Sequence, residues 1–202
     1  MERNKIEFCF KGQRDYIQGP DIYNKVNQFI IDGLNMKDII RIDLIIHRLI
    51  SNNLTVEMAK ETDSIKKENT SAIFSFVHGD NKYTLQLFES DSKIECRFEF
   101  PEEEMVKKFS VDVKEKKIYL NTNIDFTELE IITAMNKQLL NTLYADLDRK
   151  WLFTRLQTDR YLNKCNYNSI SVELLHNFNF KLTKSLIKID DRERGYIYFS
   201  RV

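Results

Sequence analysis

The chain has 202 residues, of which 42% are hydrophobic and 12% aromatic, a composition typical of one globular domain or two small ones. Its 31 basic residues equal its 31 acidic residues. A net charge of zero creates no overall field that would attract a polyanion, so the composition argues against nucleic-acid binding. No window of the sequence approaches the roughly 18 apolar residues of a membrane span, which argues against a membrane role.

The first predicted elements are a strand over residues 6–10, which ends at Gly12, and a helix that begins after it. Asp21 is expected to cap this helix with its side-chain oxygen, and Gly33 is expected to end it in the left-handed conformation. The apolar face of the helix has helical spacing and comprises Ile22, Val26, Phe29 and Ile30.

Residues 39–50 fit either a helical or a strand pattern, and their many β-branched side chains favour a long strand. A strand is predicted over 54–58, and the polar stretch 61–70 is predicted to be a solvated loop or a short helix. Two alternating runs, 72–78 and 82–89, flank Gly79-Asp80-Asn81, a pattern that indicates a β-hairpin.

In the second half, strands are predicted over 93–100, 109–113 and 117–121. The acidic triplet Glu102–Glu104 is interpreted as a solvated turn or helix start rather than a metal site. Asp125 and Glu128 have the spacing of a capping box and open the longest predicted helix. Further strands are predicted over 151–157, 170–174, 182–189 and 195–201.

The order of these elements repeats: a strand, a capped helix, a long strand, then strands ending in a hairpin. His47-Arg48-Leu49 and Thr154-Arg155-Leu156 follow the two helices at similar distances, and Gly79 and Gly195 are 116 residues apart. We interpret this pattern as an internal duplication with units 1–100 and 101–202. The predicted fold class is α+β, with a mostly antiparallel sheet wrapped around two main helices.

A strand, a long helix and antiparallel strands that curl around it resemble the hot-dog fold, and two such units resemble the double hot-dog proteins of acyl-thioester chemistry. The resemblance covers most of the chain and lies in element order. It implies a ligand of the acyl-thioester type. Dehydratase and hydratase members of the family place a His with an Asp or Glu beside the central helix. The histidines here, His47, His78 and His176, lie away from both predicted helix starts.

The loop from Lys11 to Tyr23 is the main candidate binding site, because Gly and Pro residues are concentrated in it while the rest of the chain has few. Glycine gives a ligand access to the backbone, Arg14 can bind a carboxylate or phosphate, and amide and phenol groups can orient a ligand. The predicted ligand-binding residues are Gly12, Arg14, Tyr16, Gln18, Gly19 and Tyr23. The alternative is a tight structural turn in which Arg14 pairs with Asp15 or Asp21 and the tyrosines pack on the sheet.

His47 is a candidate general base, and the alternative places it on the polar face of a half-buried strand. The common nucleotide-binding, α/β-hydrolase and zincin motifs are absent from the sequence, and we expect neither a metal nor a cofactor. The leading hypothesis is a protein that binds, or acts on, a small anionic or acyl-thioester ligand near the Lys11–Tyr23 loop. The competing hypothesis is a non-enzymatic protein that binds another protein or has a structural role.

Cys9, Cys96 and Cys165 are far apart in sequence and form no CxxC pair. This spacing argues against a zinc ribbon and a dithiol redox site, and it predicts buried free thiols in a reducing compartment. The first residues contain no apolar run of the signal-peptide type. We therefore expect a cytoplasmic protein.

Overall fold

The computed structural model describes residues 4–59, 69–146, 150–162 and 167–201. The chain divides into two compact units, Met1–Phe100 and Pro101–Val202, which we call unit 1 and unit 2. Most of the predicted loop 61–70, and Cys165, lie outside the described residues. Among the helices described, none combines the length and the apolar character needed to cross a membrane.

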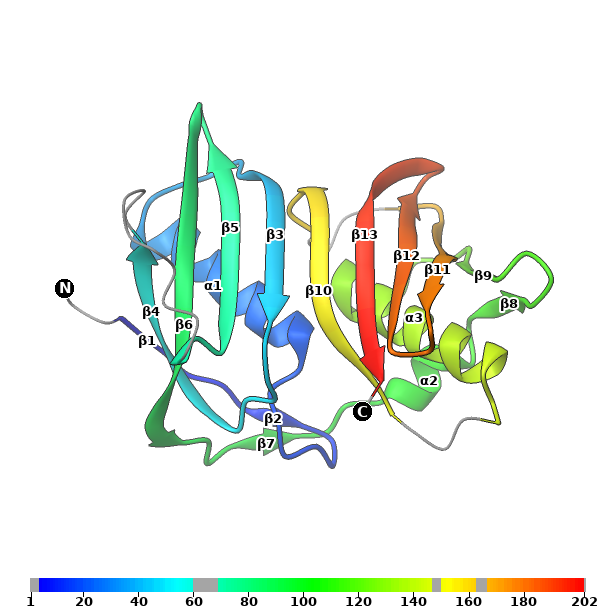
Figure 1. The fold of residues 1–202 in the computed structure, drawn as a ribbon, viewed down its shortest axis with the longest axis horizontal. Helices are drawn as coiled ribbons and strands as arrows, with labels where there is room; N and C mark the ends of the chain where they lie inside the picture. Colours follow the sequence, from blue (N-terminus) through cyan, green and yellow to red (C-terminus); the bar gives the residue numbers. More distant parts are fainter. Residues whose placement is uncertain (1–3, 60–68, 147–149, 163–166, 202) are drawn as a thin grey trace. The chain divides into compact units, whose positions relative to one another are not determined.

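Unit 1 contains a five-stranded antiparallel sheet and the helix α1 (Gly19–Gly33), which lies behind the strands in Figure 1. The strand order is β1 (Asn4–Ile6), β4 (Asn52–Ala59), β6 (Asn81–Lys93), β5 (Ala72–His78) and β3 (Ile40–Ile46). A small parallel pair, β2 (Phe10–Lys11) and β7 (Arg97–Phe98), lies outside this sheet.

The hairpin predicted around Gly79 is confirmed. His78 pairs with Asn81, so Gly79 and Asp80 form a two-residue turn between β5 and β6. Gly79 has φ = +59°, the left-handed region that such turns require. The prediction of a strand in 39–50 is also confirmed, although β3 is shorter than that range.

Both predicted ends of α1 are wrong in detail. The helix begins at Gly19, and the N-cap residue Gln18 makes no side-chain capping bond, so Asp21 lies in the first turn. The reason is Pro20, which suits the first helical positions because it has no N–H to leave unpaired and its φ is already helical. At the other end, Gly33 is helical and the C-cap Leu34 has φ = −103°, so no left-handed glycine ends this helix.

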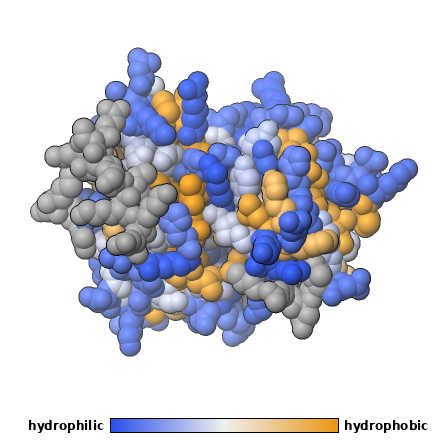
Figure 2. All heavy atoms as spheres, viewed as in Figure 1, coloured by the Kyte–Doolittle hydropathy of each residue, from blue (hydrophilic) through white to orange (hydrophobic). Residues whose placement is uncertain are grey.

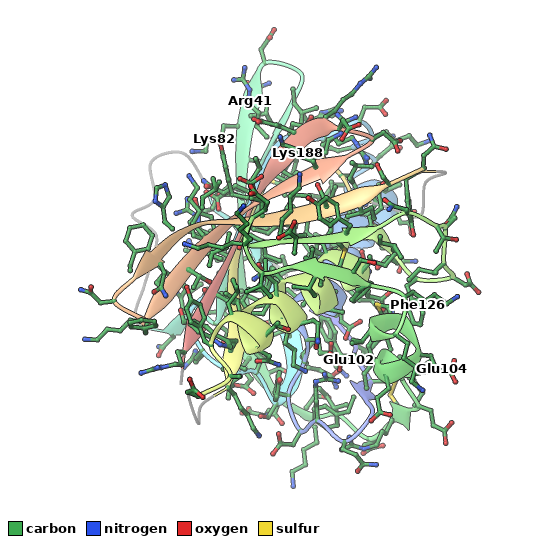
Figure 3. All side chains as sticks on the ribbon, turned by 90° about the vertical axis from the view of Figure 1, so that its right-hand side faces the viewer. Arg41, Lys82, Glu102, Glu104, Phe126 and Lys188 are labelled. Carbon is green, nitrogen blue, oxygen red and sulfur yellow. A yellow bond between two sulfur atoms is a disulfide. The ribbon has the colours of Figure 1, made fainter. Side chains whose placement is uncertain are left out.

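Unit 2 contains a six-stranded antiparallel sheet, the short helix α2 (Glu102–Val106) and the helix α3 (Glu128–Leu143). The strand order is β10 (Trp151–Arg160), β13 (Arg192–Arg201), β12 (Leu182–Ile189), β11 (Ile170–Phe178), β9 (Lys117–Leu120) and β8 (Ser110–Asp112). Glu102 and Glu104 project from α2 (Figure 3), and Glu102 accepts a 3.1 Å hydrogen bond from Lys137 of α3.

The capping box of α3 is displaced by two residues from its prediction. Thr127 is the N-cap: its hydroxyl accepts from the Glu130 N–H, and the Glu130 carboxylate accepts from the Thr127 N–H. Asp125 therefore does not cap the helix. Glu128, its predicted partner, is fully buried and pairs with Arg160 instead. The sequence contains two overlapping boxes, and burial of Glu128 selects the second.

The main sheet of each unit contains a hairpin, β5–β6 in unit 1 and β12–β13 in unit 2, but the two hairpins are inserted in opposite order. In unit 1 the first hairpin strand, β5, pairs with β3, the strand that follows the helix. In unit 2 the second hairpin strand, β13, pairs with β10, which is the strand that follows helix α3.

Figure 2 shows hydrophobic and hydrophilic side chains side by side on the viewed face of the strands.

Candidate functional site

The Lys11–Tyr23 loop is held at its start by backbone and guanidinium contacts. The Gly12 N–H donates to the Phe98 carbonyl at 2.9 Å. Arg97 donates from Nη1 to the carbonyls of Gly12 and Arg14, each at 2.6 Å. Gly12 has φ = +57°, so the turn requires the left-handed conformation at this residue. The concentration of glycine in this segment therefore reflects a shaped turn.

The predicted ligand-binding residues fall into two groups. Arg14, Tyr16 and Gln18 are partly exposed, and the Nε2 atom of Gln18 is buried without a hydrogen-bond partner among the described residues. Gly19 is buried in the first turn of α1. Tyr23 is 0% exposed, with its ring 5.7 Å from that of Phe74, so it belongs to the core of unit 1. Tyr23 was expected to contact a ligand from an open loop, but the structure places it in α1 with its side chain buried.

Lys11 of β2 and Asp21 of α1 form an ion pair that no pattern in the sequence predicted. The Lys11 Nζ atom lies 2.5 Å from Asp21 Oδ1. The same ammonium group lies 5.0 Å from the centre of the Phe100 ring and 5.8 Å from that of Phe98. Lys11 directly follows the strand predicted over residues 6–10. Nothing in the sequence pairs it with Asp21.

A groove of about 1230 Å³ opens beside this loop in unit 1, and we call it the β1–α1 groove. Its lining residues come from three segments: Lys5, Glu7, Phe8 and Cys9; Asp21, Asn24, Lys25 and Gln28 of α1; and Asn53 with Asp91, Ser92, Lys93, Glu95, Cys96 and Phe98. Of the Lys11–Tyr23 loop, Asp21 alone is among them.

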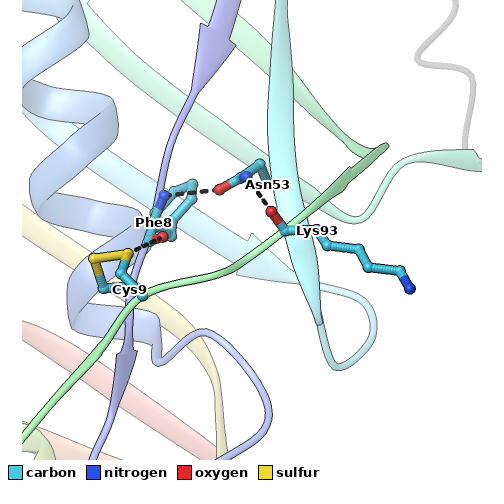
Figure 4. The surroundings of a disulfide bond; sticks show 5 residues. Phe8, Cys9, Asn53 and Lys93 are labelled. Carbon is cyan, nitrogen blue, oxygen red and sulfur yellow. Dashed lines mark hydrogen bonds between the residues drawn. A yellow bond between two sulfur atoms is a disulfide. The ribbon is translucent and has the colours of Figure 1, made fainter.

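Asn53 fixes one wall of the groove (Figure 4). Its Oδ1 accepts from the Phe8 N–H at 2.8 Å, and its Nδ2 donates to the Lys93 carbonyl at 3.0 Å. Asn53 is 5% exposed, so these bonds replace the water that its amide would otherwise bind. The sequence carries no signal for this role, because an Asn inside a strand pattern does not reveal its distant partners.

Cys9 and Cys96 form a disulfide across 87 residues, which corrects the prediction of free thiols. The bond joins the segment between β1 and β2 to the segment before β7, and both cysteines line the groove. Spacing in the sequence could not reveal the pair because the fold brings the two segments together. The argument for a reducing compartment loses its basis, since disulfides persist in oxidising environments.

The candidate base His47 lies just after β3 and is exposed. Its backbone N–H donates to the Ser71 carbonyl at 2.9 Å. His176 lies in β11, where it is exposed beside Phe178. Neither position resembles a histidine enclosed with a carboxylate.

Unit 2 has a buried carboxylate at the start of α3. Arg160 of β10 binds Glu128 with two hydrogen bonds, Nη1 to Oε2 at 3.2 Å and Nη2 to Oε1 at 3.1 Å. Nearby, the Tyr167 hydroxyl accepts from the Ile124 N–H at 3.3 Å. Burial raises the pKa of Tyr167 above the ordinary value of a tyrosine; the Ile124 N–H opposes this, and the charge of Glu128 adds to it. The bidentate pairing holds Glu128 as a structural anion.

No known protein-family profile matches the chain, and no curated protein matches it either. Solved structures do match. The dehydratase domain of PpsC from Mycobacterium tuberculosis, in complex with C12:1-CoA, aligns with a TM-score of 0.55 and 7% identity, covering 99% of this chain and 92% of that one. A protein assigned as thioesterase II from Thermobifida fusca aligns with a TM-score of 0.50 and 7% identity, covering 94% and 89%.

At 7% identity these likenesses concern the fold and not the side chains of a site. They agree with the antiparallel sheets and the few helices described above. The similar structures are hot-dog thioesterases and dehydratase domains of the double hot-dog type. The resemblance inferred from element order is therefore confirmed, and the chain has a hot-dog-like fold.

Proposed function

We propose that the chain binds a ligand of the acyl-thioester type, with the Lys11–Tyr23 loop contributing to the site. The observation that carries the proposal is the fold shared over 99% of the chain with a dehydratase domain in complex with C12:1-CoA. Arg14 would bind an anionic group of the ligand, while Tyr16 and Gln18 would orient it. The buried Nε2 of Gln18, which lacks a partner among the described residues, is a donor that a ligand carbonyl could satisfy.

We propose further that the two units are related copies of one hot-dog-like unit, each a sheet with one main helix. Asn27 lies eight residues after the first residue of α1, and Asn136 lies eight residues after the first residue of α3. Both are buried, at 2% and 0% exposure. A buried Asn is uncommon in a helix interior, so its presence at the same helical position supports a common origin. The opposite order of the two hairpins then represents a later divergence.

Binding without catalysis is the form of the proposal that the described residues support best. His47 is exposed at a strand end, and Glu128 is held by Arg160 through both carboxylate oxygens. A general acid or base needs a proton-transfer group that can reach a substrate. Glu128 does not meet this condition because both of its carboxylate oxygens are bonded to Arg160, and exposed His47 lies outside the lining of the β1–α1 groove.

The test is a thermal-shift series with dodecanoyl-CoA, free CoA and inorganic phosphate, on the wild type and on Arg14→Ala. A ligand at a hundred times its dissociation constant stabilises the fold by about 2.7 kcal/mol, which raises the melting temperature by several degrees. The expected result is a shift with dodecanoyl-CoA that Arg14→Ala removes. Arg192→Ala is the matched control, because Arg192 is an exposed arginine in unit 2. An unchanged melting temperature with dodecanoyl-CoA would contradict the proposal.

A further inference from the structure

β1 is an edge strand, and Lys5 of β1 and the residues Glu7, Phe8 and Cys9 that follow it line the β1–α1 groove. β1 is the terminal strand of the unit 1 sheet, with β4 as its one neighbour among the described strands. Figure 1 shows β1 at the margin of this sheet. Natural proteins protect such edges, since their unpaired N–H and C=O groups can pair with another chain.

Alternation along the strand assigns which main-chain groups face outward. The Phe8 N–H donates to Asn53 and the Phe10 N–H to the Cys96 carbonyl, so the even-numbered residues point toward β4 and β7. Successive residues of an extended chain direct their N–H and C=O groups to opposite sides. β1 ends at Ile6, and the bonds of Phe8 and Phe10 continue its alternation through residues 7–9, so we infer that the main-chain groups of Lys5, Glu7 and Cys9 point away from β4 and β7. These three residues line the groove.

The opposite wall of the groove is a polar stripe of α1. Asp21, Asn24, Lys25 and Gln28 recur at intervals of three and four residues, so they lie on one face of the helix. Gln28 is exposed and carries an amide that can both donate and accept. The groove thus has main-chain groups of residues 5–9 along one side and charged and amide side chains of α1 along another, with Asn53 and residues 91–98 completing the lining.

Charge and size decide what such a groove accepts. The lining has the cations Lys5, Lys25 and Lys93 against the anions Glu7, Asp21, Asp91 and Glu95. Lys5 pairs with Glu7, and Asp21 is neutralised by Lys11, so the sum is zero. A groove without net charge does not favour the phosphates of CoA. Its volume of about 1230 Å³ exceeds the roughly 300–1,000 Å³ of small-molecule sites and suits a chain segment.

We propose that the β1–α1 groove binds an extended, uncharged peptide segment, which adds as a strand to the outer edge of β1. Affinity would come from main-chain hydrogen bonds to Lys5, Glu7 and Cys9, and Gln28 would bond the other edge of the peptide. The disulfide Cys9–Cys96 and the bonds of Asn53 fix this edge before the peptide arrives, which lowers the entropy cost of binding. This interaction is independent of the acyl-thioester ligand proposed above.

The test uses a fluorescent seven-residue peptide of alternating Thr and Val with blocked termini, measured by polarisation on the full chain. Because the proposal invokes the main chain of the partner, this generic peptide should bind with a dissociation constant below about 1 mM. Glu7→Pro should weaken binding at least tenfold, since proline removes the outward N–H of residue 7. Glu7→Ala, which keeps that N–H and equally removes the contact with Lys5, should change binding less than twofold.

A second measurement keeps the test decisive if Glu7→Pro does not fold. A peptide N-methylated at alternate residues should bind the wild type at least tenfold more weakly. In addition, peptide binding should slow amide hydrogen exchange at Lys5, Glu7 and Cys9.

Failure of the generic peptide to bind at 1 mM would overturn the proposal, as would equal losses in Glu7→Pro and Glu7→Ala. If Glu7→Pro instead abolishes the thermal shift caused by dodecanoyl-CoA, the groove is the acyl site and the peptide proposal fails. The acyl-thioester proposal is tested separately, by the thermal-shift series on the wild type and Arg14→Ala.

Discussion

Lys11 and Asp21 form an ion pair that is largely withdrawn from solvent, with side-chain exposures of 9% and 15%. The pair links β2 to the first turn of α1. Breaking a buried pair by removing one partner typically costs about 3–5 kcal/mol, because the other charge stays buried. We expect Asp21→Asn to lower the free energy of unfolding by an amount in this range, measured by urea denaturation.

The matched control for this prediction is the double variant Lys11→Met, Asp21→Leu. Replacing both charges with apolar groups removes the desolvation cost together with the attraction, so the double variant should be more stable than Asp21→Asn. A single variant as stable as the wild type would show that the pair contributes nothing.

The disulfide Cys9–Cys96 should stabilise unit 1 strongly. By the loop-entropy relation, a bond that spans 87 residues contributes about 4–5 kcal/mol, and native disulfides typically contribute about 2–5 kcal/mol. We expect the Cys9→Ser, Cys96→Ser variant to lose stability within that range in urea. Mass spectrometry after alkylation of the unreduced wild type provides the control, because alkylation of both Cys9 and Cys96 would contradict the bond.

Gly195 should tolerate substitution far less than Gly79. Gly195 has φ = +137°, and a Cβ atom there would lie 1.8 Å from the Gln157 carbonyl oxygen. Gly79 has φ = +59° and open space around it. Gly79→Ala should therefore cost about 1 kcal/mol from backbone conformation alone, while Gly195→Ala should cost several times more or prevent folding. Parallel thermal melts would test the difference, and equal melting temperatures would refute it.

Tyr167 should make stability decline at alkaline pH. Burial raises its pKa in the folded state, so the folded chain keeps the phenol proton at a pH where the unfolded chain has lost it. The stabilisation is complete below the unfolded pKa of about 10 and is lost as the pH rises toward the folded value. Tyr167→Phe should flatten the difference in stability between pH 9 and pH 11 (roughly one unit on each side of that pKa). An unchanged slope would contradict this role.

The parts of the fold that the sequence predicted depend on local patterns. The hairpin at Gly79-Asp80 follows from turn chemistry and alternation, and the helix over Ile22–Ile30 follows from apolar spacing. The predictions that failed concern choices between local signals: Pro20 rather than Asp21 sets the start of α1, and Thr127 rather than Asp125 caps α3.

The groove could not be predicted because its walls meet only in the folded chain. Asn53 bonds Phe8 and Lys93 across 45 and 40 residues, and Cys9 meets Cys96 across 87. Contacts of that range leave no periodic trace in the sequence. Tyr23 illustrates the opposite case, because the helical pattern alone places it beside Ile22 and Val26 among the buried residues of α1.

The most direct test of the central claim is equilibrium binding of dodecanoyl-CoA to the wild-type chain, measured by titration calorimetry with free CoA and dodecanoate as separate ligands. Recognition of a thioester requires both parts of the ligand, so the account predicts saturable binding of dodecanoyl-CoA at least tenfold tighter than either fragment. Absence of binding, or equal affinity for free CoA, would contradict it.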